Sequence, residues 1–187
     1  MQEDIIEAIK VLQSGGIILY PTDTIWGIGC DATNEVAVQK VFELKKRVDS
    51  KALLVLVDSA VKVDFYIDEV PEIAWDLIDY AEKPLTIIYS GARNLAQNLI
   101  AEDGSVGIRV TKEDFSRKLC ERFRKAIVST SANISGETSP SNFSQISPEI
   151  IKNVDYVVKF RQTDLYNSKP SGIIRIDKGG LFKIIRE

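Results

Sequence analysis

Short runs of branched aliphatic residues recur along most of the chain, and each run reads as one β-strand. Isoleucine and valine favour an extended backbone, and an apolar run of about four to eight residues between turn signals is typical of a buried strand. The expected strands are residues 16–21, 53–57, 85–89, 106–110, 126–130, 155–160, 172–176 and 181–186. A chain with this many strands is expected to build its core around a sheet.

Helices are expected at irregular intervals between these strands. Ile5, Ile9 and Leu12 recur at helical spacing, which predicts a helix over residues 3–14. Similar patterns and end signals predict helices over residues 36–47, 71–80, 112–124 and 148–153. The pattern therefore favours an α/β fold in which a twisted sheet of parallel and antiparallel strands is flanked by helices. A length of 187 residues suits a single domain over residues 1–187.

The composition is that of an ordinary globular protein. Hydrophobic residues make up 44% of the chain and charged residues 27%, and the net charge is −3. The acidic, amphipathic start is unlike a signal peptide, and no apolar run reaches the length of a membrane span, so a cytoplasmic protein is expected. Cys30 and Cys120 are too few and too separated for a disulfide scaffold or a zinc site, and they are expected to be buried free thiols.

The chain contains no histidine, and this restricts its chemistry. Serine or cysteine nucleophiles that depend on an imidazole base are excluded. The loop VSTSANISGETSPS, residues 128–141, is nevertheless rich in hydroxyls. Hydroxyls without a base still form hydrogen bonds, so this loop is interpreted as a site for phosphate, carboxylate or ribose groups, the alternative being a polar surface turn.

Phosphate-binding and metal-binding motifs of the common kinds are absent from the sequence. It has neither GxxxxGK[ST] nor GxGxxG, and a tight zinc or iron site would need clustered cysteines or carboxylates. Magnesium is expected only as a companion of nucleotide phosphates. An enzyme with these residues works by positioning and charge neutralisation, which is what adenylyl transfer requires.

Five separated segments resemble one protein family when they are taken in order. YPTDTIWGIGCDA, FELKKRVDSKALLVLV, SVGIRV, STSANISGETSP and SGIIRI are similar to segments of the YrdC-like family of threonylcarbamoyl-adenylate synthases. The resemblance spans residues 16–186 and implies a twisted α/β sheet with a large cleft. It also implies that L-threonine, bicarbonate and ATP react to give threonylcarbamoyl-AMP and pyrophosphate. The product feeds N6-threonylcarbamoylation of adenosine 37 in tRNA by downstream threonylcarbamoyltransferase proteins.

The resemblance also implies site residues. Those expected to bind ATP are Lys45, Arg47, Lys51, Ser105, Ser129, Ser131, Asn133, Ser139 and Arg186. Among them, Lys45, Arg47, Ser131 and Asn133 are the expected catalytic residues. Thr24, Arg109 and Ser171 are expected to bind threonine, with Arg109 on its carboxylate.

Several positions depart from the family pattern. Leu56 stands where the family has a histidine of the threonine site, and Trp26 stands where it has tyrosine. Lys51 replaces an asparagine, and Thr130 replaces the proline before Ser-Ala-Asn. These changes affect the residues expected to bind threonine more than those expected to bind the nucleotide. They therefore indicate a divergent member of YrdC or YciO type with weakened threonine recognition.

Two alternatives remain open on the sequence. One is a paralogue that adenylates a different acceptor, because Leu56 and Trp26 alter the threonine side. The other is a module that binds double-stranded RNA or tRNA through Lys45, Lys46, Arg47, Lys51, Arg93 and Arg109. Basic runs such as residues 43–51 are, however, ordinarily solvated helix faces.

Overall fold

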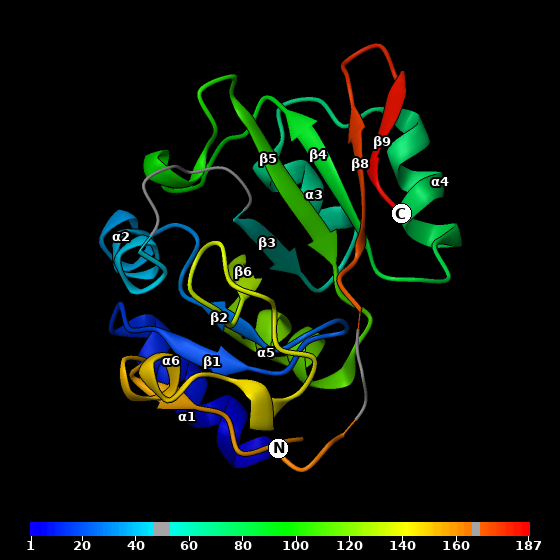
Figure 1. The fold of residues 1–187 in the computed structure, drawn as a ribbon. Helices are drawn as coiled ribbons and strands as arrows, with labels where there is room; N and C mark the ends of the chain where they lie inside the picture. Colours follow the sequence, from blue (N-terminus) through cyan, green and yellow to red (C-terminus); the bar gives the residue numbers. More distant parts are fainter. Residues whose placement is uncertain (47–52, 166–168) are drawn as a thin grey trace.

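The described strands form one sheet that mixes parallel and antiparallel pairs (Figure 1). The computed structural model describes residues 1–46, 53–165 and 169–187. The strands are β1 (Ile18–Tyr20), β2 (Gly27–Gly29), β3 (Leu54–Val57), β4 (Leu85–Ser90), β5 (Ser105–Val110), β6 (Ile127–Ser131), β7 (Tyr156–Val157), β8 (Gly172–Ile176) and β9 (Phe182–Arg186). Their order in the sheet is β7-β1-β2-β6-β3-β5-β4-β8-β9. Pairs β1–β7, β3–β5 and β4–β8 are parallel, whereas β1–β2, β2–β6, β3–β6, β4–β5 and β8–β9 are antiparallel. The predicted mixed sheet is confirmed.

Six α-helices flank the described part of this sheet. They are α1 (Gln2–Gln13), α2 (Glu35–Leu44), α3 (Val61–Tyr66), α4 (Glu72–Tyr80), α5 (Asp114–Phe123) and α6 (Pro148–Lys152). The five predicted helices are present with shifted ends, and the prediction missed α3, which has only six residues. Asn34 caps α2, because its side chain accepts a hydrogen bond from the backbone N–H of Ala37 at 3.1 Å. No described helix has the length and apolar character needed to cross a membrane.

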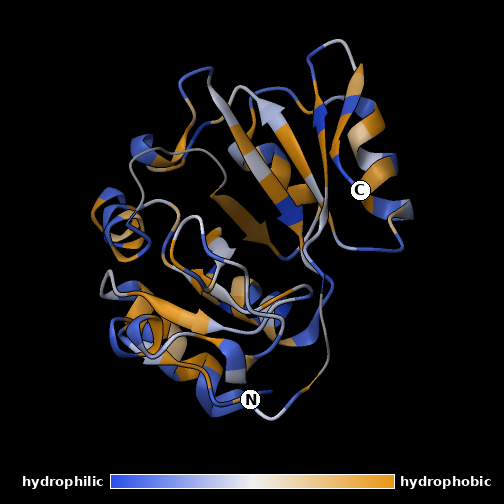
Figure 2. Ribbon diagram, in the orientation of Figure 1, coloured by the Kyte–Doolittle hydropathy of each residue, from blue (hydrophilic) through white to orange (hydrophobic). Residues whose placement is uncertain are grey.

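The central strands use their two faces for different purposes, because successive residues of a strand point to opposite sides. On one face, Ile108 of β5 pairs with Val55 of β3, and both side chains are buried. On the other face, Leu54 and Arg109 belong to cavities described below. Figure 1 places α3 behind β4 and β5, and Figure 2 shows the apolar residues along these central strands. One face is therefore packed core, and the opposite face carries the candidate site.

Strand β2 was missed by the sequence prediction, and its two glycines explain why. Glycine is depleted in strands because it adds no side chain to the packing and loses the most entropy on folding. Here, however, β2 lies between β1 and β6 in a crowded place. A Cβ atom on Gly29 would lie 2.6 Å from Cε1 of Tyr20 and 2.6 Å from the carbonyl oxygen of Val128. The strand exists because this position has no side chain.

Replacement of Gly29 by alanine is therefore expected to destabilise the fold. The added methyl group overpacks a buried site whose neighbours include backbone, for which a loss of about 1 to 3 kcal/mol in the free energy of unfolding is expected. Urea unfolding followed by circular dichroism measures this loss. Gly172→Ala is the matched control, because a Cβ there would meet its nearest atom, Cδ1 of Leu85, at 3.6 Å. Equal midpoints for both variants and the parent would contradict the packing argument.

Candidate functional site

A cavity of about 190 Å³ lies on the open face of the sheet, and we call it the serine cavity. It brings together seven residues that the sequence assigned to the site, namely Thr24, Arg109, Ser129, Ser131, Ser139, Ser171 and Arg186. The rest of its lining is Ile25, Trp26, Gly27, Leu54, Thr130, Pro170 and Ile173. These residues come from the loop after β1, from β2, β3, β5 and β6, from the loop after β6, from the segment just before β8, and from β8 and β9. Predicted ATP-binding and threonine-binding residues therefore share one cavity.

The loop between β1 and β2 presents Thr24 to this cavity. The hydroxyl of Thr22 lies 3.1 Å from that of Thr24, accepts a hydrogen bond from the backbone N–H of Thr24 at 3.1 Å and donates to the carbonyl of Ile25 at 2.8 Å. Trp26 is buried and packs its ring 4.8 Å from the ring of Phe143. The loop is therefore ordered by its own hydroxyls and by an aromatic contact beneath it.

The serine loop, residues 128–141, is fastened by Lys45 from the end of α2. The buried ammonium of Lys45 donates to the carbonyl oxygens of Ser131 and Asn133 at 2.5 and 2.6 Å. Asn133 in turn donates to the carbonyls of Ile134 and Glu137, both at 2.9 Å. Here Lys45 and Asn133 shape the backbone that carries the serines, and neither residue belongs to the lining of the serine cavity. Their direct contact with phosphate stays a prediction.

Arg109 reaches the serine cavity from β5 and is almost completely buried. Its side chain is 3% exposed, and its Nη2 lies 3.1 Å from Oδ1 of Asp23, whose side chain is 10% exposed. Among the described residues neither Arg109 Nε nor Asp23 Oδ1 has a hydrogen-bond partner, so this ion pair is close but not aligned as a hydrogen bond. Burial lowers the pKa of Arg109 and raises the pKa of Asp23, although each charge partly offsets the shift of the other.

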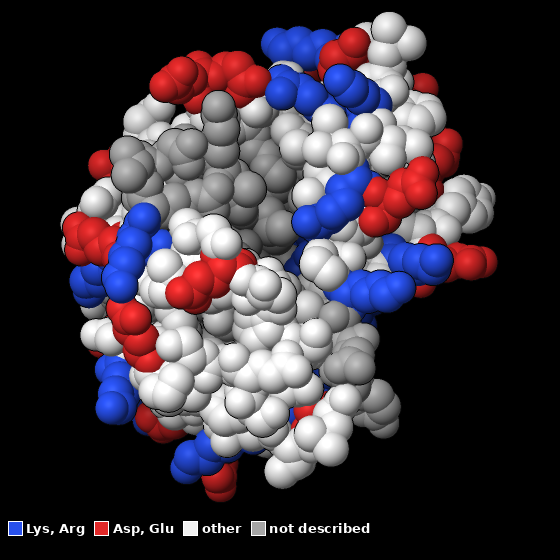
Figure 3. Space-filling model, in the orientation of Figure 1, with Lys and Arg blue, Asp and Glu red and all other residues white. Residues whose placement is uncertain are grey.

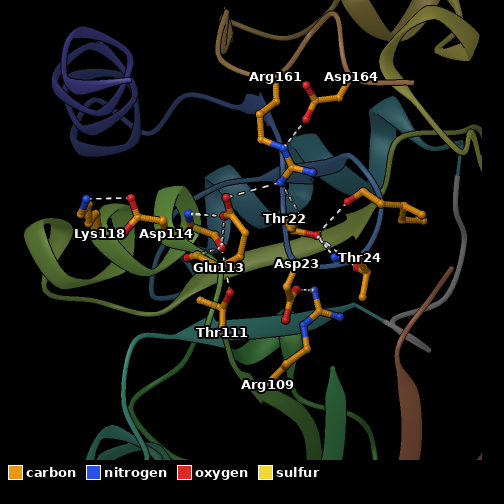
Figure 4. A network of polar contacts seen from close by, with 12 residues as sticks. Thr22, Asp23, Thr24, Arg109, Thr111, Glu113, Asp114, Lys118, Arg161 and Asp164 are labelled. Carbon is orange, nitrogen blue, oxygen red and sulfur yellow. Dashed lines mark hydrogen bonds and ion pairs between the residues drawn. The ribbon is translucent and has the colours of Figure 1, made fainter. Parts of the chain in front are cut away.

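The Asp23–Arg109 pair lies at one end of a wider polar network (Figure 4). Arg161 donates to the backbone carbonyl of Thr22 at 3.3 Å and pairs with Glu113 at 3.4 Å. Glu113 also caps α5, because its carboxylate accepts from the backbone N–H of Ser116 at 2.8 Å. The network therefore ties the loop that carries Asp23 to the start of α5.

Ser171 and Arg186 approach the cavity from the C-terminal strands. The hydroxyls of Ser171 and Thr86 lie 2.8 Å apart, and Nε of Arg186 donates to the backbone carbonyl of Ser171 at 2.9 Å. Ser171 is buried, whereas Arg186 ends the exposed strand β9. Both predicted residues therefore line the serine cavity.

Ser105 lies in an adjoining cavity of about 650 Å³, which we call the strand cavity. Leu54 and Ile173 belong to the linings of both cavities, so the two spaces are neighbours. Ser105 donates to Oδ1 of Asp103 at 2.6 Å, and Arg175 pairs with the other oxygen of Asp103 at 2.7 Å. Much of the remaining lining is apolar, so this space combines an apolar wall with one fixed carboxylate.

Arg47 and Lys51 lie outside the described residues, so their predicted contacts with ATP remain predictions. Leu56 is fully buried and pairs with Arg109 across β3 and β5, but it is absent from the described lining of the serine cavity.

Asp23 and Asp103, which contact Arg109 and Ser105, were not among the predicted residues. Their only signal in the sequence is that they stand one and two positions from Thr24 and Ser105.

The described cations give little support to a duplex RNA surface. Lys45 and Arg109 are buried, Lys46 pairs with Glu149 at 2.9 Å, and Arg93 donates to the carbonyl of Asp64 at 2.7 Å. Figure 3 shows positive and negative side chains interspersed on the face it presents, without a broad basic patch. Phosphate binding by a duplex needs several accessible cations close together, and of the predicted ones that the structure describes, only Lys46 and Arg93 are exposed, each beside a carboxylate.

Curated relatives are similar to this chain over nearly its whole length. A threonylcarbamoyl-AMP synthase of Pseudoalteromonas translucida is 29% identical over 185 residues, which cover 97% of this chain and 98% of the relative. A putative threonylcarbamoyl-AMP synthase of Methanocaldococcus jannaschii is 35% identical over 176 residues, which cover 94% of this chain and 81% of the relative.

Solved structures share the fold. E. coli YciO superimposes with a TM-score of 0.86 at 22% identity, over 100% of this chain and 90% of YciO. P. abyssi Sua5 complexed with L-threonine gives a TM-score of 0.82 at 24% identity, over 92% of this chain, which spans only 50% of the P. abyssi chain. The family described as telomere recombination, which takes in Sua5, YciO and YrdC, matches residues 10–187. The chain therefore belongs to the Sua5/YciO/YrdC family.

Proposed function

We propose that this chain is an L-threonylcarbamoyladenylate synthase of the cytoplasm. It condenses the amine of L-threonine with bicarbonate, so that water leaves, and transfers the adenylyl group of ATP to the resulting threonylcarbamate with release of pyrophosphate. The observation that carries the proposal is the serine cavity, where the buried Arg109 meets hydroxyls of Thr24, of the serine loop and of Ser171. The names of the two sequence relatives and the threonine bound to P. abyssi Sua5 support the same activity. The product would then serve tRNA threonylcarbamoyltransferase proteins.

On the threonine side, Arg109 holds the substrate carboxylate. A guanidinium pairs with a carboxylate through two parallel N–H groups, and Nε of Arg109 is buried without a described partner. The hydroxyls of Thr24 and Ser171 line the same cavity and orient the remaining polar groups of the amino acid. Positioning of this kind lowers the entropic barrier to reaction with an activated phosphate.

On the nucleotide side, the serine loop and the strand cavity supply complementary parts. Ser129, Ser131 and Ser139 offer hydroxyls to phosphate oxygens, and Arg186 adds a positive charge at the rim. Ser105 lies in the strand cavity, whose apolar wall suits a planar base. Leu54 and Ile173 line both cavities, so the two regions adjoin.

Magnesium would enter as the companion of ATP. Across the described ranges, no three His, Cys, Asp or Glu side chains are grouped so that they could hold a metal ion. The donor set therefore suits a cation already coordinated by phosphate oxygens, which supplies charge neutralisation when it is bound. The chain's own contribution is to place hydroxyls and cations around these phosphates.

Pyrophosphate release with ATP, bicarbonate and a panel of amino acids tests the proposal directly. Threonine is expected to give pyrophosphate and threonylcarbamoyl-AMP, identified by mass spectrometry. Complementation of a strain that lacks its own synthase, read out as threonylcarbamoylated tRNA, extends the test to the cell. If another amino acid gives product and threonine gives none, the acceptor assignment is wrong and the alternative of a paralogue is correct.

Replacement of Arg109 by glutamine is expected to raise KM for threonine ~10- to 100-fold, because the charged contact with the carboxylate is lost. KM for ATP is expected to change little. Lys125→Gln is the matched control, because it also removes the cation that pairs with a buried carboxylate, that of Asp31. Both variants are expected to lose stability. A rise in the threonine KM of Lys125→Gln as large as that of Arg109→Gln would contradict the assignment of Arg109 to the threonine carboxylate.

Ser105→Ala is expected to raise the pKa of Asp103. The hydrogen bond from Ser105, followed by that from Arg175, lowers this pKa from 3.8 to about 2. A carboxyl whose pKa is lowered by folding adds stability above its unfolded value, and this stability is lost as the pH falls from about 4 towards 2. Carboxyl NMR titration measures the change, with Asp114, held by Lys118, as the internal control. An unchanged Asp103 titration would contradict the contact.

Both cysteines are expected to be dispensable for turnover. Cys30 and Cys120 are buried free thiols, as predicted, and burial raises the pKa of each well above its ordinary value. A protonated, enclosed thiol is a poor nucleophile. Cys30→Ala and Cys120→Ala should therefore keep kcat in the pyrophosphate assay. Complete loss of turnover in either folded variant would reveal a thiol-dependent step.

A further inference from the structure

The guanidinium of Arg109 has one ion-pair partner among the described residues, Asp23. Arginine has several rotatable bonds, yet a bidentate pair with a carboxylate requires its planar N–H groups to face the ligand. No aligned hydrogen bond holds Arg109 Nε among the described residues. The ion pair recorded for this guanidinium runs from Nη2 to Oδ1 of Asp23, 3.1 Å away.

Asp23 belongs to a different space from the one that Arg109 serves. Arg109 lines the serine cavity, whereas Asp23 lines a separate cavity of about 350 Å³ together with Thr22, Glu113 and Arg161. The carboxylate thus stands beside the guanidinium but is not part of the serine cavity lining, and Figure 4 shows the two side chains facing each other. An acidic group in this place attracts one end of the guanidinium and leaves the remaining N–H groups for a ligand.

The loop around Asp23 is itself held in place. Arg161 binds the backbone carbonyl of Thr22, and the Thr22 hydroxyl accepts from the backbone N–H of Thr24. Asp23 is therefore fixed between two anchored neighbours, one on each side. A carboxylate on an anchored backbone is suited to orient a long, flexible partner.

We propose that Asp23 is a positioning residue, which orients the Arg109 guanidinium for the carboxylate of the amino-acid substrate and so determines threonine affinity. The inference rests on the proposed function. It assigns Asp23 no contact with the substrate and no role in ATP binding. Its effect is consequently expected in the threonine KM and not in the ATP KM.

Asp23→Asn tests this inference, because it keeps the shape of the side chain and removes its charge. KM for threonine is expected to rise about tenfold, with KM for ATP unchanged. In an Arg109→Gln background the same change should add little further loss, because the group that Asp23 orients is already absent. Asp31→Asn is the matched control, because Asp31 is also a buried carboxylate with a cation partner, Lys125, and lies outside the serine cavity.

The outcomes separate the inference from the proposed function. A parent protein that makes no threonylcarbamoyl-AMP overturns the proposed function itself. A parent that turns over threonine, together with an Asp23→Asn variant of unchanged threonine KM or of full additivity with Arg109→Gln, overturns only the role of Asp23. If Asp23→Asn does not fold, Asp23→Glu replaces it. That variant keeps the charge but displaces it by one methylene, and an unchanged threonine KM would again overturn the inference.

Discussion

The alternation of side chains along the central strands is the constraint on which the site depends. Because Val55 and Ile108 pack on one face of neighbouring strands, Leu54, Gly107 and Arg109 are directed to the other. A slip of one residue in register would bury the polar set and expose the core. The hydrophobic effect that stabilises the covered face therefore also decides which residues can line the two cavities. Fold stability and site composition are set by the same register.

Burial of the Arg109 side chain, which β5 carries, is unfavourable in free energy, and the charge of Asp23 beside it reduces this penalty. A charge removed from water is strongly unfavourable unless an opposite charge or a set of hydrogen bonds compensates. Asp23 supplies the opposite charge, but the contact is not aligned as a hydrogen bond and leaves Arg109 Nε without a described partner. A substrate carboxylate at this guanidinium would add a second opposite charge and an aligned pair of hydrogen bonds.

The sequence predicted the class of fold and most of the helices and strands, because periodicity reports burial directly. It missed β2, because Gly27 and Gly29 are selected by close packing with neighbours that only the folded chain brings near. Family resemblance predicted seven residues that meet in one cavity, but it did not separate Ser105 into the adjoining space. It also did not reveal that the Lys45 ammonium binds loop carbonyls. These facts depend on three-dimensional approach between distant segments, for which sequence spacing carries no signal.

The hydrogen-bonding side chains in the described lining of the serine cavity are serines, threonines, arginines and one tryptophan, with no carboxylate or imidazole among them. A histidine in their place would change charge between about pH 5 and 8 and with it the field at the substrate. The described lining offers no carboxylate or imidazole as a base, so loss of a proton from an amino-acid ammonium would involve the substrate itself, solvent or a group outside this lining. Asp23, with its raised pKa, is in contact with Arg109 but lies outside this lining, in the neighbouring cavity. The cavity itself therefore acts by orientation and fixed charge, which is the kind of catalysis that a chain without histidine can supply.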